Sequence, residues 1–118
     1  MAEILDYHDA CINKIEHRFK ENELVIGITL SDSREFDVIF DDVIGWDFSP
    51  FSFQNYLLDL KMYTHDKLPG FIIEDYEVKP RYIELMLLKS ARFFEFNPAA
   101  GMGGYIIAQN FKVVLRAD

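Results

Sequence analysis

The sequence predicts a β-rich fold, either all-β or α+β, with an antiparallel meander sheet and at most one or two helices. Apolar and polar residues alternate in several short segments, which is the period of a strand with one buried face. Short polar turns separate these segments, and short connections favour antiparallel neighbours. Half of the 118 residues are hydrophobic and 15% are aromatic. This supplies one core, so we expect a single domain over residues 1–118.

The first half of the chain is predicted to form four consecutive strands. They cover residues 15–19, 24–30, 36–40 and 43–48. Polar turns at 20–23 and 31–33 separate the first three, and the pair Asp41-Asp42 separates the third from the fourth. The first two strands are expected to form a hairpin.

Two segments of the second half fit either a helix or a strand. In residues 52–63 the spacing of the apolar residues fits both, with Ser52 as a possible helix N-cap, and we slightly favour a strand. In residues 80–96, Pro80 can open a helix or precede a strand from Tyr82 to Leu88.

The remaining segments are predicted as loops and closing strands. Residues 67–70 contain Pro and Gly and are expected to form a loop. Asn97–Gly104 is expected to be a flexible loop, followed by strands at 105–108 and 111–115.

The charge is unevenly distributed. The net charge is -8; residues 1–78 hold seventeen acids and six bases, and residues 79–118 hold three acids and six bases. The acidic part is unsuited to nucleic acid, because neutralising phosphate is the main source of such affinity. A basic protein partner would be attracted instead, although acidity can also serve solubility alone.

The small motifs do not predict catalysis, a cofactor or a metal site. His8-Asp9 followed by Cys11 resembles a nucleophile with its base, but in a strand His8 would point away from the other two. His65-Asp66, beside the Pro-Gly loop, is not expected to be catalytic either. The three histidines lack the spacing of a metal site. The calcium-loop pattern is absent around Asp41, and Gly101, Gly103 and Gly104 match no phosphate-loop pattern.

An acidic segment with interleaved aromatic residues is the strongest candidate for a partner-binding site. Residues 32–47 carry six acids and one base, and the aromatic rings there include Trp46. Carboxylates can pair with Lys or Arg of a partner, and large aromatic side chains supply interface anchors. The alternative is that the rings are all core and the acids a solvated face. The predicted partner-binding residues are Asp32, Glu35, Asp37, Asp41, Asp42, Trp46 and Asp47.

Cytoplasmic localisation is expected. The N-terminus is acidic and lacks the apolar run of an export signal, and the densest apolar run, at residues 85–88, is too short to cross a membrane. The single Cys11 cannot form an internal disulfide, as is usual in a reducing compartment. The sequence leaves the oligomeric state open.

The order of these features resembles the small bacterial toxin-immunity proteins of the immunity protein 50 group and its relatives. The resemblance rests on residues spread over most of the chain: His8-Asp9-Ala10 with Ile12 and Ile15, Leu24-Val25-Ile26, Phe40 with Val43 and Trp46, residues 55–60, and Ile106, Ala108 and Val113. It implies a cytosolic antidote that binds a cognate toxin, and no catalytic motif.

Two functions of different classes are therefore expected. The first is a stoichiometric inhibitor whose acidic face covers the basic active site of a toxin, with a nuclease as the favoured kind. The alternative is a regulatory domain that binds a small molecule or peptide in an apolar pocket behind Gly101–Gly104. An enzyme built on His8, Asp9 or His65 is the least favoured reading.

Overall fold

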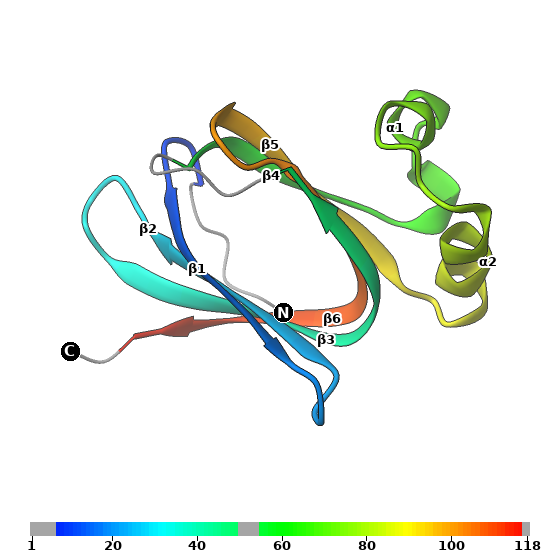
Figure 1. Cartoon of the computed structure of the whole chain (residues 1–118), viewed down its shortest axis with the longest axis horizontal. Helices are drawn as coiled ribbons and strands as arrows, with labels where there is room; N and C mark the ends of the chain where they lie inside the picture. The colour runs from blue at the N-terminus through cyan, green and yellow to red at the C-terminus, as the bar shows by residue number, and fades with distance from the viewer. Residues whose placement is uncertain (1–6, 50–54, 117–118) are drawn as a thin grey trace.

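A computed structural model describes residues 7–49 and 55–116, and in this part of the chain the strands form a closed barrel (Figure 1). The order around the barrel is β1-β2-β3-β6-β5-β4, and all neighbours are antiparallel. The prediction of a β-rich antiparallel fold is confirmed. The strands are β1 (Cys11–Arg18), β2 (Glu23–Thr29), β3 (Glu35–Phe48), β4 (Tyr56–Tyr63), β5 (Arg92–Ala100) and β6 (Gly104–Leu115).

The third and fourth predicted strands are one continuous strand, β3, so the predicted interruption at Asp41-Asp42 is wrong. Asp42 has φ 49°, a left-handed conformation that Asp tolerates better than most residues. The strand bends there, and its register against β6 shifts between Val43 and Gly45 without loss of the pairing. A bend of this kind lets a long strand curve around a barrel.

The same correction applies at the end of the chain. The predicted closing strands 105–108 and 111–115 are one strand, β6, and the predicted flexible loop is much shorter than expected. β5 continues to Ala100 because Pro98 lies at an irregular part of the β4 pairing, where a residue without an N–H group is tolerated. Residues 101–103 alone make the turn.

Both ambiguous segments are resolved by the structure. Residues 56–63 form β4, as the slight preference for a strand predicted, and residues 52–54 of that segment lie outside the described residues. The strand option for Tyr82–Leu88 is wrong: α2 (Pro80–Leu88) places Pro80 in its first turn, where its missing N–H group costs no hydrogen bond. β5 takes up the rest of residues 80–96.

Part of the region predicted as a loop is helical. A 3-10 helix, η1 (His65–Lys67), is followed by α1 (Gly70–Asp75), so Gly70 begins a helix rather than ending a loop. Pro69 precedes the helix with an extended φ and ψ. None of the helices in the described part of the chain is long and apolar enough to span a membrane.

Two apolar layers hold the fold together. The inner layer fills the barrel and contains Phe40, Phe94 and Phe96. The outer layer lies between the barrel and the two helices, which cover one side of it (Figure 1), and contains Met86, Phe93 and other side chains. Strands β5 and β6 contribute to both layers because alternate residues face opposite sides of a strand.

The barrel closes between β1 and β4 through few contacts in the described residues. Cys11 is paired with Tyr56. Three backbone hydrogen bonds flank this pair: Asp9 N–H to Leu57, Leu57 N–H to Ala10, and Ile12 N–H to Asn55. The Asn55 side chain is buried and accepts a hydrogen bond from the Met102 N–H at 3.0 Å. Asn55 therefore ties this closure to the turn before β6.

Candidate functional site

Asp32 and Glu35, two of the seven predicted partner-binding residues, lie at the start of β3 and contact basic groups of the chain itself. Asp32 accepts a hydrogen bond from the Arg34 backbone N–H and is 2.8 Å from its guanidinium. The backbone bond first, and the guanidinium second, hold the pKa of Asp32 below its usual value. Glu35 Oε1 is 3.8 Å from Arg116 Nη1. These carboxylates are therefore partly neutralised before any partner arrives.

Asp37 is less exposed than Asp32 and Glu35 and contacts two basic side chains of the chain itself. Its side chain is only 17% exposed and lies between Lys14 Nζ, 3.2 Å from Oδ2, and Arg116 Nε, 3.2 Å from Oδ1. The space over Gly27 on the neighbouring strand is filled by Lys14 and Arg116. This arrangement ties β1 to the end of β6, and we assign Asp37 a structural role.

Asp41 faces another carboxyl group. It is paired across the sheet with Glu23. Partial burial first, and then the hydrogen bond and negative charge of Glu23, raise the pKa of Asp41, while Lys112 offsets part of this effect. Arg18 is 3.4 Å from Glu23, so Glu23 has a cationic partner. Asp41 thus keeps an incompletely compensated negative charge at this point of the sheet.

We expect Asp41→Asn to stabilise the protein at neutral pH. A folded-state pKa above the unfolded value means that folding favours the protonated carboxyl group, so stability falls as pH rises through that window and the full cost is present above it. The gain at pH 7 should be up to about 1 kcal/mol and should shrink as pH falls toward the raised pKa. Urea unfolding at several pH values measures it. A loss of stability at pH 7 would contradict it.

Trp46 belongs to an exposed aromatic group that the sequence did not predict. The indole packs against His17 with ring centroids 4.8 Å apart, and His17 packs against Phe19 at 6.1 Å. Phe19 is 83% exposed and Trp46 is 37% exposed. We name His17, Phe19 and Trp46 the tip cluster, because it lies where the β1–β2 turn meets β3.

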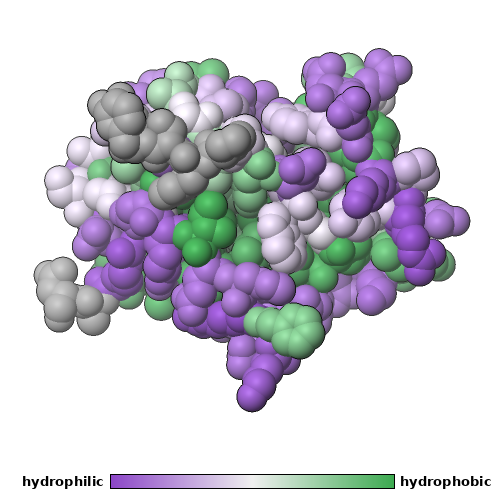
Figure 2. Space-filling view, in the orientation of Figure 1, coloured by the Kyte–Doolittle hydropathy of each residue, from purple (hydrophilic) through white to green (hydrophobic). Residues whose placement is uncertain are grey.

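The local backbone explains why the tip cluster is exposed next to acids. Asn22 has φ 53°, which lets the chain reverse tightly after Phe19. The Val43 N–H donates to the Asn22 carbonyl at 3.4 Å, which fastens the turn to the bend at Asp42. Asp42 and Glu21 are both exposed, and Figure 2 shows mainly hydrophilic side chains around this turn. The structure thus places Asp42 where the β1–β2 turn meets β3, whereas Asp41 follows the inner-layer residue Phe40 and faces the outer side of the sheet together with Glu23.

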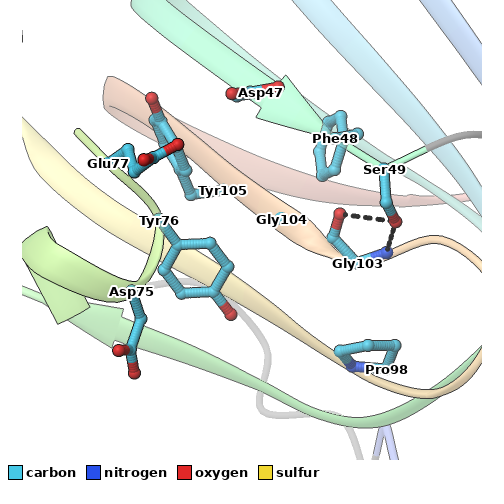
Figure 3. A pocket seen from close by; sticks show the side chains of 10 residues that line it. All are labelled: Asp47, Phe48, Ser49, Asp75, Tyr76, Glu77, Pro98, Gly103, Gly104 and Tyr105. Atoms are coloured by element: carbon cyan, nitrogen blue, oxygen red, sulfur yellow. Dashed lines mark hydrogen bonds between the residues drawn. The ribbon is translucent and has the colours of Figure 1, made fainter. Parts of the chain in front are cut away.

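Asp47 lies at the opposite end of β3 from Asp37 and borders a pocket of about 390 Å³. Its walls come from the end of β3, from residues 75–77 at the end of α1, and from the β5–β6 turn (Figure 3). The alternative prediction expected an apolar pocket behind Gly101–Gly104, and Gly103 and Gly104 do line this one. Its rim, however, carries three carboxylates, those of Asp47, Asp75 and Glu77.

His8 and Asp9 contact each other, and the Cys11 thiol contacts a backbone carbonyl oxygen. His8 Nε2 is 3.5 Å from Asp9, and its Nδ1 is 3.1 Å from the Leu58 carbonyl oxygen. The Cys11 thiol lies 3.9 Å from the Ile12 carbonyl oxygen. Within residues 7–49 and 55–116, no three His, Cys, Asp or Glu side chains come together as a metal site.

Comparisons with known proteins add no assignment. No protein-family model matches the chain, and no curated protein matches it significantly.

Proposed function

We propose that this chain is a cytoplasmic protein-binding domain that inhibits a cognate toxin by stoichiometric binding. The observation that carries the proposal is the tip cluster, an exposed group of rings that meet edge to face near the exposed carboxylates of Glu21 and Asp42. Large aromatic side chains dominate interface energies when a partner buries them. The resemblance to the immunity protein 50 group supplies the class of partner.

The charge around the tip cluster favours a basic partner. On the outer face of the same strand, partial burial first and then Glu23 disfavour the anionic form of Asp41, and Lys112 offsets this only in part. A Lys or Arg side chain from the partner would therefore relieve a remaining repulsion as well as form a new pair. Nuclease active sites are basic because they hold phosphate, and carboxylates can occupy such a site in its place. A nuclease toxin is therefore the partner that fits best.

The internal ion pairs narrow the proposed contact surface. Asp32, Glu35 and Asp37 already contact Arg34, Lys14 or Arg116, and the contacts of Glu35 and Asp37 join separate parts of the barrel. The proposed surface therefore keeps Asp41, Asp42 and Trp46 of the predicted set. It adds His17 and Phe19, which lie beside Trp46.

Calorimetric titration with a toxin domain encoded beside the gene tests the proposal. We expect Phe19→Ala or Trp46→Ala to weaken binding by about 2 kcal/mol, roughly thirtyfold, because each removes a ring anchor. Asp42→Lys should weaken binding more strongly at low salt than at high salt, because dissolved ions screen the interaction between charges.

The matched control is Phe71→Ala, which removes an exposed ring from α1 on another surface. Its affinity should stay within about twofold of the unmodified protein. If Phe19→Ala, Trp46→Ala and Asp42→Lys all bind like this control, the tip cluster is not the contact surface. If no toxin domain encoded beside the gene binds, the toxin-inhibitor function is wrong.

A further inference from the structure

The pocket beside Asp47 lies on a different surface from the tip cluster. Trp46 is paired with Ile106 of the inner layer, and the next residue, Asp47, is paired with Tyr105 of the outer layer. Successive residues of a strand face opposite sides of the sheet. The pocket therefore faces outward, between the end of α1 and the edge formed by β3 and β6.

Aromatic rings held in place by packing and hydrogen bonds form the pocket walls. The Tyr76 hydroxyl donates to Glu95 Oε2 at 2.7 Å, and its ring meets Tyr105 edge-on at 5.9 Å. Tyr105 is 2% exposed and stacks on Phe93 at 5.0 Å. Figure 3 shows Phe48 on the side of the pocket away from these two tyrosines. A flat guest would meet preset rings rather than mobile side chains.

The floor of the pocket is backbone that side chains cannot fill. Gly104 has φ 151°, and a Cβ there would clash with the backbone of Asp47 and Phe48. Ser49 holds the adjacent Gly103 through both backbone groups: its hydroxyl accepts from the N–H at 2.9 Å and donates to the carbonyl oxygen at 3.3 Å. These two bonds are drawn in Figure 3, and they fix the floor of the pocket.

The pocket carries negative charge without a local counter-charge. Asp47, Asp75 and Glu77 are exposed at its rim, and none of its lining residues is basic. Among the described residues, no Lys, Arg or His forms an ion pair with these three. Burial first, and then the charge of Asp47, raise the pKa of Tyr105 to about 12, so this phenol is neutral at physiological pH. The walls are therefore neutral rings under an anionic rim.

From this combination we propose that the pocket binds a guanidinium group, packed against the accessible part of the Tyr76 ring and paired with the carboxylates of Asp47 and Glu77. Guanidinium is planar, stacks on aromatic faces and forms paired hydrogen bonds to carboxylates. The rings and carboxylates lie within one pocket, and Figure 3 shows Asp47 and Glu77 on the same side of it as Tyr105. This site is independent of the tip cluster.

An NMR titration of the full chain tests the proposal with two probes. Ethylguanidinium represents a free ligand, and the capped peptide acetyl-Gly-Arg-Gly-amide represents an arginine side chain of a protein. We expect saturable shifts of the Gly103, Gly104 and Tyr105 amides with at least one probe. Shifts with ethylguanidinium alone assign a small-molecule ligand, and shifts with the peptide alone assign an arginine of a partner; both outcomes support the guanidinium site.

Matched variants and a neutral probe separate recognition from general attraction. Asp47→Asn and Glu77→Gln should each weaken binding about fivefold or more, the loss expected for one charge-assisted hydrogen bond. Glu84→Gln makes the same change in net charge at an exposed position of α2 outside the pocket, and should change the affinity by less than twofold. The peptide with citrulline in place of arginine should cause no saturable shift.

Three results would overturn the proposal. They are the absence of saturable shifts with both probes, equal binding of the citrulline and arginine peptides, and affinities of Asp47→Asn and Glu77→Gln that match Glu84→Gln. None of them bears on the toxin titration, which concerns Phe19, Trp46 and Asp42. The two proposals can therefore fail separately.

Discussion

Replacing Phe40 by alanine should lower the free energy of unfolding by about 3–5 kcal/mol, the usual cost of truncating a fully buried Phe. Phe40 has no exposed surface, and its ring lies 4.9 Å from that of Phe94, 6.0 Å from Phe96 and 6.2 Å from Phe111. The lost ring would leave a cavity bordered by three other large rings, which cannot collapse without moving β5 and β6. Urea unfolding followed by circular dichroism measures the change.

The control is Phe71→Ala on α1, where the ring is 61% exposed. Truncating it should change the free energy of unfolding by no more than about 0.5 kcal/mol. Similar losses for the two variants would mean that the rings inside the barrel do not form its core. A variant of Phe40 that is too unstable to purify agrees with the expectation, and Phe40→Leu, which keeps most of the volume, should then rescue folding.

Local patterns predicted the parts of the fold that depend on alternation. The apolar residues of 24–30 and 36–40 repeat every second position, and both segments are strands with one face in the inner layer. The slight preference for a strand at 56–63 was confirmed as well. In these segments the burial of one face favours a strand, and that burial is visible in the sequence as an apolar residue at every second position.

The errors occurred where tertiary structure overrides local preference. Asp41-Asp42 resembles a turn, but the barrel uses Asp42 as a bend in a continuous strand. Pro98 and the glycines after it resemble a long loop, but β5 pairs with β4 up to Ala100. α1 has only six residues and follows Pro69, so the segment is too short for a helical spacing of apolar residues to be recognised in the sequence.

The candidate site was predicted in part, because charge is visible in a sequence and its compensation is not. Asp37 looked like a free carboxylate, yet its partners Lys14 and Arg116 are distant along the chain and meet it only when the barrel closes. The tip cluster was missed for the opposite reason. His17 and Phe19 alternate like buried residues, but the β1–β2 hairpin carries them beyond the covered part of the sheet.

Gly104→Ala should destabilise the protein by about 3 kcal/mol or more, from backbone strain combined with overpacking. Its φ of 151° lies where residues with a Cβ are strained, and the added methyl group would clash with the Asp47 carbonyl oxygen and with the Cα of Phe48. Those contacts are with backbone atoms, which cannot rotate away, so the paired ends of β3 and β6 must separate.

Gly70→Ala is the control, because its Cβ would meet no atom within 4 Å and the site is helical. It should be neutral or stabilising by about 0.4–1 kcal/mol, since alanine restricts the unfolded chain. Thermal unfolding of both variants separates a requirement for glycine at the pocket floor from a general effect of removing glycine; equal midpoints would show that the β3–β6 end tolerates a side chain.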